Sequence, residues 1–181
     1  MLKREAVSHF LVTIIWLALV TLLRWQWGGD LIFLWLGGLL GTVLLDLDHL
    51  LYVFIHPQEL TSLRVKRLLG QHRFWEALVL LADTVEERKR LSFHNALFQP
   101  LLYGLCFFVL TSTGSLFGAG LVMALALHLL KDEIELLLKG KEDYLRGWLF
   151  WPVRKEISLQ NQRFFIILML LIFLVLNLLL V

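Results

Sequence analysis

No formal charge appears between residue 95 and residue 130 of this chain, and this long stretch is mostly apolar. A helix needs about 20 apolar residues to cross the roughly 30 Å hydrocarbon core of a bilayer. The stretch is therefore too long for one membrane span, and the polar, glycine-containing segment 111–115 divides it into two. The chain is 59% hydrophobic with a mean hydropathy of +0.75, which excludes an ordinary soluble domain.

The apolar blocks predict an all-α integral membrane protein with a single domain of residues 1–181. Five transmembrane helices are expected, at about residues 9–27, 31–49, 95–112, 116–138 and 164–181. A shorter apolar piece, Phe74–Ala82, cannot cross a bilayer and is expected to lie as an interfacial helix in the loop 56–93.

The positions of Lys and Arg predict the orientation of these spans. Seven basic residues lie in the loop 56–93 and six in the loop 139–163, whereas the segment 111–115 has none. Lys3 and Arg4 add two at the N-terminus. The positive-inside rule then places the N-terminus and both loops in the cytoplasm and the C-terminus outside. The membrane is expected to be a bacterial or archaeal cytoplasmic (inner) membrane. Basic residues that flank apolar spans suit lipid headgroups, so no nucleic-acid partner is expected.

Ionisable side chains fall at the predicted cytoplasmic ends of three separate spans. These residues are Asp46, Asp48, His49, His94, His128 and Asp132. Residues on separate helices need not share a depth, so their agreement in depth indicates a common site. Ionisable residues inside a membrane protein are costly to bury and usually serve a function.

Helical periodicity groups these residues further. His128 and Asp132 are spaced i and i+4, and Asp46 and His49 are spaced i and i+3, so each pair shares a helix face. Asp48 points elsewhere on a regular helix. It is expected to join the site only if the helix frays there, or to support a ligand from behind.

Imidazole and carboxylate together suit zinc or another first-row divalent ion. The single cysteine, Cys106, lies in an apolar run and offers no thiolate site. The residues that could hold one metal ion with an open position, or two ions, are Asp46, His49, His94, His128 and Asp132. Each motif alone also fits a simpler role, as a hydrogen-bonded pair between spans, a solvated helix end or a capping region. His9 and His56 are interpreted as interfacial residues.

Four segments, in this order and spacing over residues 37–153, resemble the YdjM-type family of LexA-regulated inner-membrane metal-dependent hydrolases. They are LDLDH at 45–49, KRLSFHN at 89–95, HLLKD at 128–132 and GWLFWP at 147–152. The chain departs from that family at Leu45, Lys89 and Asn95, which replace a proline, a histidine and a serine. The missing histidine implies a reduced ligand set. A more distant similarity to the zinc phospholipase C group implies phosphoester hydrolysis.

The resulting hypothesis is a metal-dependent hydrolase at the cytoplasmic membrane face, acting on a phosphoester or phospholipid headgroup. In it Asp48 is a bridging ligand or general base, and Arg90 holds a phosphate oxygen. The expected partner is a membrane lipid or lipid-linked substrate. Two alternatives stay open: a divalent-metal or proton transporter, and a non-enzymatic membrane adaptor whose polar cluster only joins helices.

Overall fold

A computed structural model describes residues 2–25 and 28–181 of the chain, and these residues form helices and connecting loops without a strand. The all-α class is therefore confirmed. The described part does not include Gln26 and Trp27, which end the first predicted span. It also leaves out the side chains of Lys3 and Arg4, on which the predicted orientation partly depends. The helices are α1 (Leu2–Arg24), α2 (Leu31–Leu44), α3 (Leu47–Ile55), α4 (Leu60–Gly70), α5 (Phe74–Asp83), the short 3₁₀ turn η1 (Val85–Glu87), α6 (Phe98–Ser112), α7 (Leu116–Leu138), α8 (Glu142–Leu149) and α9 (Leu159–Leu180).

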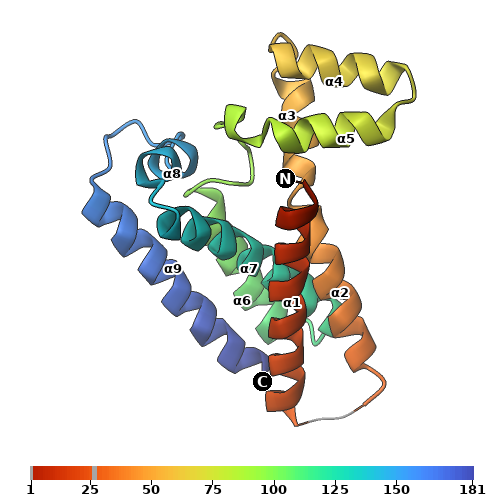
Figure 1. Cartoon of the computed structure of the whole chain (residues 1–181). Coiled ribbons are helices and arrows are strands. Elements are labelled where there is room, and N and C mark those ends of the chain that lie inside the picture. The colour runs from red at the N-terminus through yellow and green to blue at the C-terminus, as the bar shows by residue number, and fades with distance from the viewer. Residues whose placement is uncertain (1, 26–27) are drawn as a thin grey trace.

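Three apolar stretches of the described chain are long enough to cross a membrane: Val7–Arg24, Leu31–Ile55 and Leu159–Leu180. The chain is thus compatible with a membrane protein. Of the other two predicted spans, α6 is apolar but has only 15 residues, and α7 has 23 residues with charged side chains in its last turns. In Figure 1, the N-terminus, the α4–α5 pair and α8 lie at one end of the molecule, and the C-terminus lies at the other.

Two helix boundaries differ from the prediction for local reasons. The second span continues to Ile55, but α2 and α3 are separated by a tight turn in which the Asp46 N–H bonds the carbonyl of Val43. Helix α6 begins at Phe98, three residues later than expected. Its start is set by Asn95, whose side-chain oxygen accepts the backbone N–H groups of Leu97 and Phe98, each at 3.0 Å.

Glycines allow α2 and α7 to pack with their backbones almost in contact. A Cβ atom on Gly37 would lie 2.0 Å from the carbonyl oxygen of Phe117, and one on Gly120 would lie 2.2 Å from that of Leu34. Small residues at such spacings let membrane helices approach closely. This contact brings the end of α2 beside the middle of α7. It therefore sets the distance between Asp46, which follows α2, and His128 of α7.

Candidate metal centre

Five of the predicted ligands are brought to one region at the end of the helix bundle. They come from the α2–α3 turn (Asp46), from α3 (His49), from the loop before α6 (His94) and from α7 (His128 and Asp132). The imidazole ring centroids of His94 and His128 are 5.8 Å apart, and those of His49 and His94 are 5.5 Å apart. The expected convergence of separate helices is therefore present in the structure.

His128 is held in one orientation by the end of α2. Its Nδ1 atom lies 2.9 Å from the carbonyl oxygen of Thr42. That carbonyl belongs to the last turn of α2, where carbonyl groups lack the usual partners within the helix, and the turn diverts the Asp46 N–H to Val43 instead. Because a carbonyl only accepts, His128 Nδ1 carries a proton, and in the neutral ring the lone pair is on Nε2.

The free nitrogen of His128 faces two carboxylates. His128 Nε2 lies 3.4 Å from an oxygen of Asp132 and 3.6 Å from an oxygen of Asp46. These are ion-pair distances, yet Nε2 is buried and makes no hydrogen bond. Asp46 is half-exposed, so the site opens to the surroundings on that side.

His9 of α1 joins this group, although the sequence interpretation placed it in the interface. Its ring stacks on His128 with centroids 4.0 Å apart, and its Nε2 lies 3.1 Å from Asp132. Ligand atoms of His9, His128 and Asp132 all lie within 4.8 Å of one another. Lys131 also lies here, with Nζ 3.1 Å from His9 Nε2 and 2.5 Å from Glu135. His9 stands at the predicted cytoplasmic end of the first span, so the depth criterion could have found it.

Asp48 lies behind His94 and not among the ligand atoms. It is fully buried, and its two oxygens accept the backbone N–H groups of Ser92, Phe93 and His94 at 2.6–3.2 Å. One oxygen also lies 3.1 Å from His94 Nδ1. A carboxylate accepts, so His94 Nδ1 donates, and in the neutral ring the lone pair is on Nε2. This arrangement fits a support for His94, not the bridging ligand or general base expected for Asp48.

The arginine that contacts the site is Arg88, which the sequence interpretation left out. Its side chain is buried, and its Nε lies 3.2 Å from His49 Nδ1. The same guanidinium donates to Thr84 Oγ1 at 2.8 Å and to the carbonyl of Leu81. Burial lowers the pKa of Arg88 from its usual value. Arg90, the predicted phosphate ligand, is exposed.

The donor set fits a divalent metal ion. An unpartnered buried imidazole nitrogen between two carboxylates calls for an explanation, and an ion is one of the few available. Two histidines have Nδ1 fixed by a carboxylate or a carbonyl, which is the usual arrangement around metal-binding imidazoles. Ligand atoms of His9, His128 and Asp132 lie close enough together to hold such an ion. Asp46, 3.6 Å from His128, and His94, whose ring lies beside that of His128, are further candidates.

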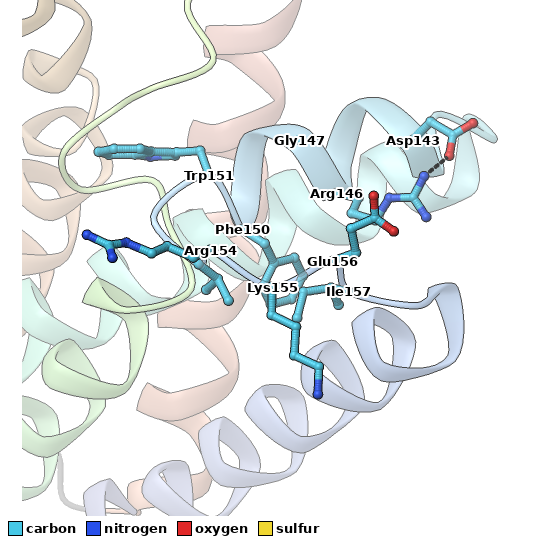
Figure 2. A pocket seen from close by; sticks show the side chains of 10 residues that line it. Asp143, Arg146, Gly147, Phe150, Trp151, Arg154, Lys155, Glu156 and Ile157 are labelled. Carbon is cyan, nitrogen blue, oxygen red and sulfur yellow. Dashed lines mark hydrogen bonds and ion pairs between the residues drawn. The ribbon is translucent and has the colours of Figure 1, made fainter.

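One hollow in the described chain lies away from this cluster. A pocket of about 430 Å³ is lined by α8 and the segment after it, including Arg146, Trp151, Arg154 and Lys155. Figure 2 shows that Arg146 is paired with Asp143 and that the side chains of Arg154 and Lys155 point in different directions. The cations do not converge, so this pocket is not assigned as an anion site.

Comparisons with known proteins found no match: no protein-family model, no curated protein and no solved structure corresponds to this chain. The geometry of the histidine and aspartate cluster is therefore the basis on which a function is proposed.

Proposed function

We propose that this chain is a membrane-embedded, metal-dependent hydrolase that acts at the cytoplasmic membrane face on a phosphoester or lipid-headgroup substrate. The observation that carries the proposal is the buried, unpartnered Nε2 of His128, which lies 3.4 and 3.6 Å from the carboxylates of Asp132 and Asp46. The resemblance to the YdjM-type family points to the same chemistry.

The ion would be held by His128, Asp132 and His9, with Asp46 and His94 as the remaining ligands. Imidazole and carboxylate ligands favour zinc, with one ion or two as the site allows. When bound, such a metal polarises the scissile group and lowers the pKa of a coordinated water toward about 7.

The chain's own residues have separable tasks in this proposal. Thr42 and Asp48 fix the rings of His128 and His94, so their Nε2 lone pairs are available without reorganisation. Asp46 lies on the exposed side of the site, where a substrate would arrive. Arg90, exposed on the loop before α6, would meet an anionic headgroup.

The membrane arrangement is part of the proposal. Five spans, with the N-terminus and both long loops in the cytoplasm, agree with the location of α1's start, the α4–α5 pair and α8 at one end of the molecule (Figure 1). Helix α5 suits the interface because it is apolar on two sides. Ala77 and Leu81 pack against Val53 and Val65, while Trp75 is 65% exposed.

One observation favours a second candidate, the non-enzymatic adaptor. Lys131 Nζ lies 3.6 Å from Asp132 and 3.1 Å from His9, so a cation of the chain already compensates part of the acidic charge. A cluster neutralised in this way could join α1 and α7 without any ion. A transporter is less favoured, since the cluster lies toward one end of the bundle and not at the midplane that transporters use.

Elemental analysis of the detergent-purified protein separates these candidates. The hydrolase proposal predicts a stoichiometric transition metal, and release of phosphate or a phosphorylated headgroup from a panel of phospholipids and lipid-linked phosphates when that metal is present. The adaptor predicts no bound metal. Metal without hydrolysis of any panel substrate, together with metal uptake into proteoliposomes, would favour the transporter.

A further inference from the structure

The histidines of the cluster are not equivalent, because their hydrogen bonds place their protons on different atoms. His94 and His128 each have Nδ1 against an acceptor, Asp48 in one case and the Thr42 carbonyl in the other. Both rings therefore present a lone pair at Nε2. His49 instead faces a hydrogen-bond donor.

The partner of His49 Nδ1 is the Arg88 guanidinium, with Nε at 3.2 Å. Guanidinium nitrogens donate hydrogen bonds and do not accept them, and Arg stays protonated in proteins. His49 Nδ1 must therefore be the acceptor. A neutral imidazole with a lone pair at Nδ1 has its proton on Nε2.

Arg88 is fixed firmly enough to impose this arrangement. It is among the largest fully buried side chains, with 1% of its surface exposed. Besides His49 it donates to Thr84 Oγ1 at 2.8 Å and to the carbonyl of Leu81, so all three guanidinium nitrogens have acceptors. A different pairing for His49 would leave a buried N–H of Arg88 without a partner, which is costly.

We infer that His49 is a hydrogen-bond donor to the substrate and not a metal ligand. Its Nε2–H would contact an anionic phosphoryl oxygen bound at the site, beside the ring of His94. His49 is partly exposed, unlike His94 and His128, as a group that touches substrate should be. The inference rests on the proposed function and names phosphoryl-oxygen recognition as the role of this residue.

The test compares metal binding and phosphate binding in matched histidine variants. His49→Ala removes the donor, His49→Gln keeps an N–H donor of similar reach, and His128→Ala removes a proposed ligand. His72→Asn is the control, since His72 is an exposed loop histidine with a positive φ of 57°, which Asn tolerates. Titration of Co²⁺ followed by its visible absorption reports on the metal, and calorimetric titration of inorganic phosphate into the metal-loaded protein reports on the donor.

The inference predicts that His49→Ala binds Co²⁺ with the wild-type stoichiometry and spectrum. Its affinity for inorganic phosphate falls about tenfold, as expected for loss of one hydrogen bond to a charged group, and His49→Gln recovers part of that loss. Circular dichroism confirms that each variant is folded. His49→Ala also leaves the buried Arg88 Nε–H without its acceptor, so this variant is expected to be less stable than the wild type, whereas the Gln side-chain oxygen can replace that acceptor.

Two results would overturn the inference alone: His49→Ala and His49→Gln losing Co²⁺ as completely as His128→Ala, or His49→Ala binding phosphate as tightly as the wild type. Absence of metal from the wild type would instead overturn the proposed function and this inference with it. The two failures are therefore distinguishable in one set of titrations.

Discussion

Helix α7 carries two adjacent acidic residues, Asp132 and Glu133, whose surroundings differ completely. Asp132 contacts His9 at 3.1 Å and His128 at 3.4 Å, and its side chain is 23% exposed. Glu133 is fully buried, accepts one hydrogen bond from Gln99 at 3.3 Å and leaves its other oxygen without a partner. Neighbouring residues on a helix point about 100° apart, so the two carboxylates face different helices.

The two clusters differ in how their polar atoms are organised. Around Asp132, the imidazoles of His94 and His128 each have one nitrogen fixed and the other free. Around Glu133, one carboxylate oxygen of Glu133 itself and the Gln99 amide oxygen lack an assigned hydrogen bond, and no cluster of metal-ligating side chains is found there among the described residues. Burial of a polar group thus does not by itself indicate a site. The informative feature is a set of nitrogens oriented by separate partners.

The largest effect should come from His128→Ala. Mutating a residue that only hydrogen-bonds a metal ligand typically lowers metal affinity by roughly 10–100-fold. His128→Ala should lower it further, because it removes the ligand nitrogen that faces both carboxylates. Metal content after dialysis, measured by plasma mass spectrometry, checks this. Glu133→Gln is the matched control on the same helix, and equal metal loss in the two variants would erase the distinction between the clusters.

A smaller but broader effect is expected from Gly120→Ala, which separates α7 from α2. The added Cβ would meet the Leu34 carbonyl oxygen at 2.2 Å, so the helices must move apart. We expect a loss of about 1–3 kcal/mol in stability and weaker metal binding, because Asp46 and His128 lie on opposite sides of this contact. Thermal unfolding in detergent measures the first effect. Gly104→Ala, where a Cβ would meet nothing within 4 Å, should retain wild-type stability or exceed it.

Asp48→Asn should weaken metal binding indirectly, through the orientation of His94. Asn keeps one acceptor oxygen, but its NH₂ group cannot accept the backbone N–H groups now bound by the carboxylate. Loss of an outer partner predicts about 10–100-fold weaker metal binding, with the metal still detectable at high concentration. Competition titration against a chelator gives the affinity, and an unchanged value would show that Asp48 does not act through His94.

The smallest effect is expected from Glu133→Gln. The neutral amide has nearly the same volume and can still accept the hydrogen bond from Gln99, while a buried carboxylate with an unpartnered oxygen is removed. Stability should stay within about 1 kcal/mol of the wild type or rise. A fall in the unfolding temperature as large as that of Gly120→Ala would mean that Glu133 has a role that its contacts do not reveal.

The sequence predicted the helical class and the convergence of Asp46, His49, His94, His128 and Asp132, because hydropathy and charge placement determine the depth of each residue. It could not predict the direction of Asp48, which depends on the turn between α2 and α3.

Arg88 and Arg90 show a second feature that could not be predicted from the sequence. Spacing along the chain favoured Arg90, whereas the fold buries Arg88 against His49, 39 residues away in sequence. Tautomers of the histidines depend on such long-range partners, so metal ligands and hydrogen-bond donors cannot be separated by pattern alone. His9 was within reach of the depth argument, since it lies near the start of α1, at the predicted cytoplasmic end of the first span, and its ring stacks on that of His128.

The cluster of His9, Asp46, His94, His128 and Asp132 is proposed to hold a metal ion. The most direct measurement is the metal content of the purified wild-type protein and of its His128→Ala variant, by plasma mass spectrometry after chelator-free purification. The proposal predicts a stoichiometric divalent transition metal, zinc first, in the wild type and its loss in the variant. A folded wild type without stoichiometric metal, or full occupancy in the variant, would contradict it.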